Sequence, residues 1–124
     1  MDSKAILRTA LLDQFTSFVK ELSEMYPNDP DFSMFLMTIN LLKQTNPIMI
    51  VKYIYDNTSI YYEQIMNKDK SFFIDHTFDE YKQYLKMDIF TKMKEYFNTM
   101  SDESKENVWL YSQNIVRLAK ACYS

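Results

Sequence analysis

The sequence predicts an all-α protein, a compact irregular bundle of five to six helices with no sheet. Large apolar side chains recur at steps of three and four residues over most of the 124 residues, which is the period of a helix buried on one side. Asn, Asp and Pro residues separate these stretches and offer helix caps. The chain has no glycine, on which tight hairpin turns and phosphate-cradling loops depend. We therefore expect a single helical domain over residues 1–124, without a P-loop or dinucleotide fingerprint.

The first two helices are predicted from an apolar stripe and from proline punctuation. The first runs from about Ser3 to Met25. Pro27 is expected to end it, because a proline disfavours helix in the residue before it. The second is expected over residues 32–44, with Asp31 as its N-cap.

The middle of the chain predicts a central helix followed by shorter pieces. Asn46 and Pro47 form a start signal, and the helix that follows is apolar nearly all round, which places it near the centre of the bundle. Residues 56–59 favour caps over helix interior, so a break or kink is expected there. A shorter helix is expected over 60–67, and then a loop over 68–77 that holds one helical turn.

Two long helices are predicted for the rest of the chain. The β-branched and aromatic content of residues 71–78 also fits a strand, but the chain offers no partner strand. Thr77 or Asp79 is expected to start a fifth long helix that ends near Met100. Ser101 is expected to cap a final helix that continues to the C-terminal residues.

Charge and cysteine content limit the classes of function. The net charge is −3 and spread along the chain, without a basic block for phosphate contacts. The single cysteine, Cys122, cannot form an internal disulfide, which fits a reducing compartment, and its place on the last apolar stripe predicts a buried side chain. The longest apolar run is four residues, and the N-terminus lacks a signal-peptide pattern. We expect a cytoplasmic protein that does not enter a membrane.

No catalytic, metal or cofactor site is predicted. His76 is the single histidine, and it is flanked by Asp75 and Asp79. A structural zinc site needs four ligands and a catalytic one three, mainly from Cys and His, which one histidine and a distant Cys122 do not supply. The sequence therefore predicts a protein that is not an enzyme and binds no cofactor.

Nucleic acid is the weaker of two predicted partner classes. Four lysines, at positions 82, 86, 92 and 94, lie among aromatic residues, but carboxylates at 79, 80, 88 and 95 are interleaved with them. Proteins that bind single strands combine aromatic side chains with a net positive groove. This stretch has mixed charge, so the sequence argues against nucleic acid while leaving an accessory factor as the alternative function.

Protein contact is the favoured interpretation, because the aromatic content of 16% exceeds what the core of a small bundle needs. Phe72 and Phe73 follow Asp69 in a predicted loop, where one ring is expected in the bundle and the other near the surface. Trp109 is offset from the main stripe of its helix. These three aromatic residues are the candidate partner-binding residues. The competing explanation is that a composition biased towards Lys, Asn, Ile, Tyr and Phe simply fills a core.

Two aromatic motifs carry a family resemblance. One begins at Asn46-Pro47 and the other is the closing helix. Their residues are Tyr61, Tyr62, Ile65, Lys68, Asp69, Phe72, Phe73, Glu80 and Tyr81 in the first, and Lys105, Trp109, Tyr111, Ile115, Leu118 and Ala119 in the second. The layout resembles uncharacterised small helical proteins of nucleocytoplasmic large DNA viruses, the giant viruses of algae and protists. The resemblance implies a viral origin, in host cytoplasm or virion, and it assigns no catalytic residue.

The predicted function is a non-enzymatic interaction or assembly module, which acts through a protein partner or through self-association. The nucleic-acid-associated accessory factor remains the alternative. A contiguous exposed apolar patch would favour the first, and lysines clustered on one face would favour the second.

Overall fold

The computed structural model describes residues 3–75, 85, 87 and 89–124, and every regular element in them is a helix. The predicted all-α class is therefore confirmed for an irregular, compact bundle. The elements are α1 (Ser3–Met25), α2 (Pro30–Thr45), α3 (Pro47–Thr58), the 3-10 turn η1 (Ser59–Tyr61), α4 (Tyr62–Met66), α5 (Ser71–Asp75), α6 (Ile89–Tyr96), the 3-10 turn η2 (Phe97–Thr99) and α7 (Asp102–Cys122).

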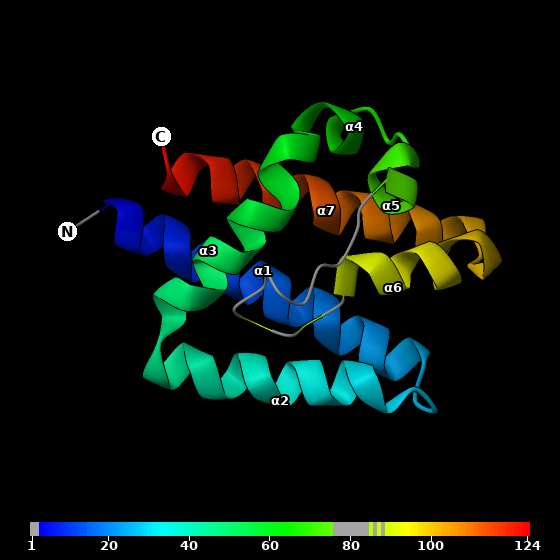
Figure 1. Cartoon of the computed structure of the whole chain (residues 1–124), viewed down its shortest axis with the longest axis horizontal. Coiled ribbons are helices and arrows are strands. Elements are labelled where there is room, and N and C mark those ends of the chain that lie inside the picture. The colour runs from blue at the N-terminus through cyan, green and yellow to red at the C-terminus, as the bar shows by residue number, and fades with distance from the viewer. Residues whose placement is uncertain (1–2, 76–84, 86, 88) are drawn as a thin grey trace.

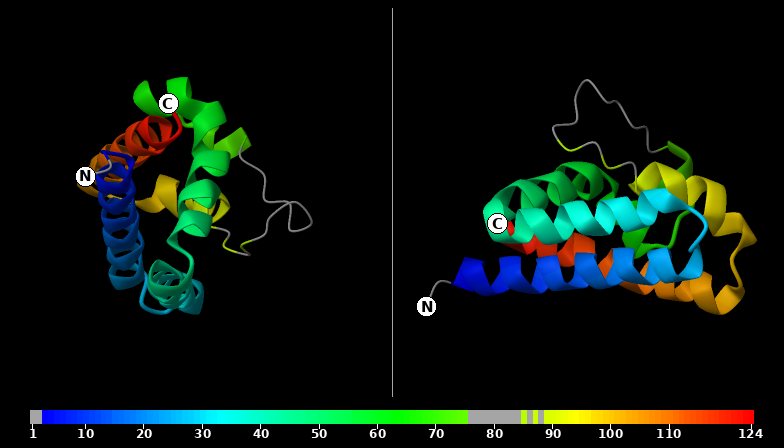
Figure 2. Two further views of the ribbon diagram at one scale, coloured as in Figure 1. Left: turned by 90° about the vertical axis from the view of Figure 1, so that its left-hand side faces the viewer. Right: turned by 90° about the horizontal axis from the view of Figure 1, so that it is seen from below.

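Helix α1 organises the bundle by packing against α7, α2 and α3 (Figure 1). It runs antiparallel to both α2 and α7, and α3 crosses over it. The start of α1 and the end of α7 lie side by side (Figure 2), where the Lys4 ammonium donates to the carbonyl of Ala121 at 2.7 Å. That contact satisfies a carbonyl at the end of α7 and places a cation at the negative end of its dipole.

The core is built around aromatic rings. Phe15 of α1 lies 6.4 Å from Tyr53 of α3 and 6.3 Å from Phe90 of α6, measured between ring centroids. The Tyr53 hydroxyl donates to the backbone carbonyl of Met87, which gives the buried phenol a partner. Burial therefore ties α1, α3 and the segment before α6 into one cluster.

The predicted end of α1 and start of α7 are confirmed, whereas the start of α2 is shifted. Helix α1 ends at Met25 and α7 begins after Ser101, whose hydroxyl accepts from the Ser104 amide at 3.1 Å. Asp29, and not Asp31, caps α2 through a 3.0 Å bond from the Asp31 amide. The reason is that Pro30 occupies the first helical position, where its missing N–H costs nothing.

The predicted break after α3 is present, at the end of the predicted stretch 56–59. The helix continues through Asn57 and Thr58, whose buried side chains each bond back to a carbonyl four residues earlier at 2.8 Å. The geometry changes at η1 instead, before α4 resumes. Helix α3 packs against α1, α2 and α7 as expected of a central helix, but Lys52 and Asp56 form an exposed ion pair on its outer side.

The predicted fifth long helix is wrong in the part that the structure describes. Its expected start at Thr77 or Asp79 lies outside the described residues, but Leu85 and Met87 are not helical and α6 begins only at Ile89. Leu85, Met87 and Ile89 are all buried. The predicted single helical turn within 68–77 is present as α5, so the strand alternative fails over residues 71–75.

Candidate functional site

The three predicted partner-binding residues lie in the core. Phe72, Phe73 and Trp109 are 0%, 2% and 5% exposed. Phe73 lies 4.8 Å from Phe72 and 5.2 Å from Trp109 between ring centroids. The expectation that one ring of the Phe pair stays near the surface is wrong, because both rings are buried. These rings therefore offer a docking protein almost no exposed surface.

Trp109 is offset from the main stripe of α7 because this helix is buried on two sides. Val108, Ile115 and Ala119 belong to the stripe that the sequence shows. Trp109 starts a second buried line with Ser112 and Val116, one position further round the helix. Helix α7 packs against α1, α3 and α4, and the Trp109 ring lies against Phe73 of α5 and Phe97 of η2, which accounts for the second line.

A polar cluster joins the turn before α2 to α6. One carboxylate oxygen of Asp29 accepts from the Lys92 ammonium at 2.6 Å and from the Tyr96 hydroxyl at 2.5 Å, and the other accepts from the Asp31 amide. The hydrogen bonds from Lys92 and Tyr96 lower the pKa of Asp29 to about 2. Burial alone would lower the pKa of Lys92, but its bonds to Asp29 and Asp31 outweigh burial and raise it.

This Asp29–Lys92–Tyr96 cluster is suited to fixing structure. The Lys92 ammonium stays charged, so it is a poor nucleophile, and both Asp29 oxygens already accept hydrogen bonds. The Tyr26 and Tyr96 rings stack beside it with centroids 4.0 Å apart. The cluster therefore clamps the α1–α2 turn onto α6, and its polar atoms are occupied by one another.

The other chemical candidates carry no site in the described residues. His76 and Asp79 lie outside them, and the residues that are described contain no group of three His, Cys, Asp or Glu side chains able to hold a metal. Cys122 is partly buried where full burial was predicted, and desolvation raises its thiol pKa. In the same part of the chain, each helix is too short or too polar to cross a lipid bilayer.

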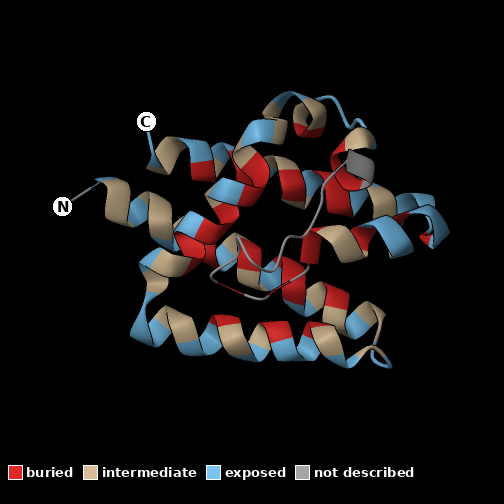
Figure 3. Cartoon of the chain, viewed as in Figure 1, coloured by how far each residue is buried: buried red, intermediate tan, exposed pale blue. Residues whose placement is uncertain are grey.

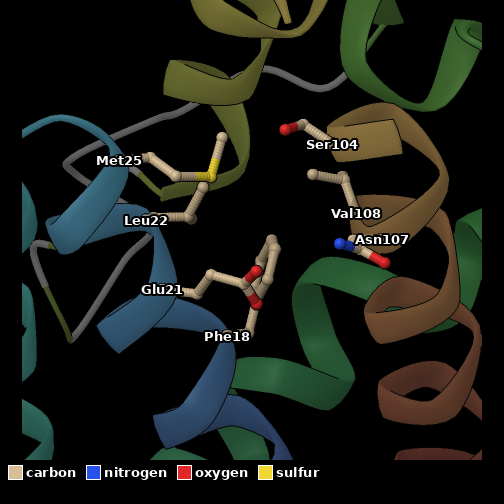
Figure 4. Close-up of a pocket in the computed structure, with 7 residues that line it drawn as sticks. All are labelled: Phe18, Glu21, Leu22, Met25, Ser104, Asn107 and Val108. Atoms are coloured by element: carbon tan, nitrogen blue, oxygen red, sulfur yellow. The ribbon is translucent and has the colours of Figure 1, made fainter. Parts of the chain in front are cut away.

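The cavity between the end of α1 and the start of α7 is too small for a ligand (Figure 4). Its volume is about 10 Å³, which is room for one water molecule at most. Phe18, Leu22 and Val108 line it with apolar atoms, while the side chains of Glu21 and Asn107 lie at its side. It is a packing gap between two helices.

The outer face of α2 is the prominent apolar surface of the described residues. Met34, Met37 and Leu41 are 57%, 73% and 63% exposed. Their spacing of three and four residues puts them in one line along the helix. Helix α2 lies at the edge of the bundle (Figure 1), and much of its outer side is exposed (Figure 3). We call Met34, Met37 and Leu41 the α2 stripe.

Polar groups next to the α2 stripe are satisfied within the helix. Thr38 and Thr45 donate their hydroxyl protons to the carbonyls of Met34 and Leu41, each at 3.0 Å. The charged residues of α2 are Asp31 in its first turn and Lys43 in its last. A partner that covers the stripe would therefore strand neither a charge nor a threonine hydroxyl without a hydrogen bond.

In comparisons with protein-family models, curated proteins and solved structures, nothing matched the chain. No residue role is therefore transferred from a relative, and function is inferred from geometry. The sequence reasoning missed the α2 stripe although its signal was present. Phe32, Phe35 and Ile39 form the buried line of α2, and Met34, Met37 and Leu41 form a second apolar line on the opposite side.

Proposed function

We propose that this protein is a non-enzymatic interaction or assembly module that pairs with a second copy of itself through the α2 stripe. The observation that carries the proposal is one uncharged helix face on which three large apolar side chains are more than half exposed. Isolated exposed apolar residues are normal on protein surfaces, whereas a contiguous line of them favours an interface.

The spacing of the stripe is self-complementary. In an antiparallel pair related by a two-fold axis near Met37, Met34 of each copy lies opposite Leu41 of the other, and the two Met37 side chains meet at the axis. The same surface then serves both copies, as an isologous interface requires. Methionine suits such a contact because its flexible, polarisable side chain adapts to an irregular neighbour.

Charge also favours a second copy on this face. The chain has a net charge of −3, so two copies repel each other when they approach in most orientations. The residues between Asp31 and Lys43 are uncharged, so the repulsion is smallest where α2 meets α2. The polar residues along its flanks, Ser33, Asn40 and Gln44, are exposed and form an uncharged rim.

The expected association is weak. Burying the exposed part of each stripe residue contributes roughly 1–2 kcal/mol, or roughly 6–12 kcal/mol for the six side chains of a pair. Association costs roughly 4–15 kcal/mol in lost freedom of motion and side-chain ordering. At the favourable end of both ranges the balance is roughly 8 kcal/mol, a dissociation constant of about 1 µM, and over the rest of the ranges it is weaker, so the pair needs a high local concentration, as in an assembly.

Light scattering over a concentration series tests the pairing. We expect the mass of the unmodified protein to rise towards that of a dimer, and the Met37→Lys variant to remain a monomer because it places two like charges at the axis. Ile60→Lys is the matched control, since Ile60 is 75% exposed but lies outside the stripe, on η1. A mass that stays monomeric at all concentrations, or equal losses in the two variants, contradicts the proposal.

Disulfide crosslinking tests the orientation. In a Cys122→Ser background, a Met37→Cys variant should form a disulfide-linked dimer on mild oxidation, because the two copies of position 37 meet at the axis. An Ile60→Cys variant in the same background should crosslink no faster than random collision. If both crosslink equally, the copies do not pair along α2.

The nucleic-acid alternative has less support. Bases stack on exposed aromatic faces, but the rings of Phe73, Phe97 and Trp109 are buried, between 2% and 5% exposed.

We also propose a viral origin, which rests on the aromatic motifs alone. Detecting the protein by mass spectrometry in purified virions or infected cytoplasm would support it, and finding its coding sequence in a cellular chromosome without viral neighbours would count against it.

A further inference from the structure

A second feature, independent of the α2 stripe, is a pocket between α5, α6 and η2. Its volume is about 360 Å³, within the usual range for small-molecule sites. Phe73 and Phe97, 2% and 3% exposed, form its floor. Lys70, Lys94 and Asn98 complete the lining, and all three are exposed. We call these five residues the lysine pocket.

The two lysines of this pocket have no carboxylate partner among the side chains that the structure describes. No carboxylate oxygen of a described residue lies within 4.0 Å of the ammonium nitrogen of Lys70 or Lys94. A third ammonium group, that of Lys105, lies 5.7 Å from the centroid of the Phe97 ring. The pocket therefore gathers positive charge on a chain whose net charge is −3.

The neighbouring carboxylates that the structure describes do not form ion pairs with Lys70 or Lys94. Asp69 precedes Lys70, but one of its oxygens accepts from the Ser71 amide at 2.9 Å. Glu106 of α7 forms an ion pair with Lys68. Glu95 follows Lys94 on α6 and is exposed to solvent.

We infer that the lysine pocket binds a small phosphate monoester with a planar or apolar body, of the size of a mononucleotide. A phosphate monoester carries a charge of roughly −1.5 to −2 near neutral pH, which matches two ammonium groups. Lysine binds phosphate as a point charge, and the Asn98 amide offers a further donor. The body of the ligand fills the pocket above Phe73 and Phe97, whose small exposed areas form its apolar floor.

Trp109 provides the readout. It is the chain's single tryptophan, and its ring centroid lies 5.2 Å from that of Phe73 and 5.5 Å from that of Phe97, the two rings of the pocket floor. Titration with AMP at constant ionic strength should change its fluorescence with a saturating curve. Adenosine, which lacks the phosphate, should give a much weaker response, and calorimetry with AMP should give the same affinity as fluorescence.

Charge-removing variants locate the site. Lys70→Gln and Lys94→Gln should each weaken AMP binding about fivefold to tenfold, because each removes a charge-assisted contact. Lys43→Gln is the matched control: it removes the same charge from the last turn of α2, outside the lysine pocket, and should bind AMP like the unmodified protein. Each substituted lysine is at least partly exposed, so the variants should fold, which circular dichroism can verify.

Three results would overturn the assignment. One is a response to AMP that never saturates, and another is an equal loss of affinity in Lys43→Gln and Lys94→Gln. The third is a single-stranded oligonucleotide that binds far more tightly than AMP, which would mark a nucleic-acid surface instead. The Met37→Lys variant should keep AMP binding, so failure of the α2 pairing and failure of this site are distinguishable.

Discussion

Two groups of large apolar side chains, one on α2 and one around α7, differ sharply in exposure. Met34, Met37 and Leu41 are between 57% and 73% exposed, whereas Phe73 and Trp109 are 2% and 5% exposed. The difference follows from the neighbours, because α7 packs against α1, α3 and α4, while α2 packs against α1 and α3. A second apolar line on a helix is thus core where another helix covers it, and a docking surface where none does.

The same contrast holds for ion pairs. The side chains of Lys92 and Asp29 are 16% and 12% exposed and join residues 63 positions apart. Those of Lys52 and Asp56 are 57% and 42% exposed and lie one turn apart on α3. Their separations of 2.6 and 2.7 Å are nearly equal, so the energetic difference comes from solvent screening and from what each pair connects.

The largest effect is expected where the aromatic core is opened. Trp109→Ala should lower the free energy of unfolding by about 3–5 kcal/mol, because it leaves a cavity between Phe73 and Phe97. Leu110→Ala, one position along α7 on a side chain 49% exposed, should cost less than about 1 kcal/mol. Urea unfolding followed by circular dichroism measures both. Equal losses of unfolding free energy in the two variants would contradict the view that burial decides the cost at these positions.

A smaller effect is expected from the partly buried ion pair. Lys92→Met keeps the aliphatic stem but leaves the Asp29 carboxylate without its cation, and should cost about 1–3 kcal/mol. Lys52→Met should leave the unfolding midpoint within experimental error, since its pair is exposed and local. The comparison fails if Lys52→Met destabilises the protein as much as Lys92→Met.

Caps and prolines in the sequence were sufficient to predict those helix ends that depend only on residues within one turn. Pro27 and the apolar stripe predicted the end of α1, and Ser101 predicted the start of α7, because caps and prolines act within one turn. The segment at Leu85 and Met87 could not be predicted in this way. Its residues continue a helical spacing, but the buried Tyr53 hydroxyl donates to the Met87 carbonyl, a contact 34 residues away.

The candidate site was harder to predict than the fold, for a physical reason. Amphipathic spacing shows which side chains share a face of a helix, but not which face another helix covers. Trp109 was predicted to bind a partner because it lies off the main stripe, and the line through Met37 was not distinguished because α2 already had one apolar line. Assigning inside and outside to two apolar lines requires the tertiary arrangement.

The pH dependence of stability isolates the role of Asp29. Its pKa is lowered to about 2 from 3.8, first by the hydrogen bond from Lys92 and then by that from Tyr96. Because the folded state favours the ionised carboxylate, this stabilisation is fully present above the unfolded pKa and is lost as the pH falls through the folded one. We expect the contribution of Asp29 to the free energy of unfolding to decline between about pH 5 and pH 2.

Asp29→Asn, which keeps the side-chain oxygen that caps α2, is the variant that measures this loss. The gap in unfolding free energy between the unmodified protein and Asp29→Asn should be widest near neutral pH and narrow as the pH falls from about 5 to 3. Other carboxylates titrate over the same range, but they do so in both proteins and cancel in the difference. In a Tyr96→Phe background, adding Asp29→Asn should lower the free energy of unfolding by less at neutral pH. The reason is that Tyr96→Phe has already removed one of the hydrogen bonds that favour the charged carboxylate. A gap that stays constant from pH 6 to pH 3 would mean that Asp29 clamps the turn through shape rather than charge, and the contrast between the two ion pairs would then lose its electrostatic basis.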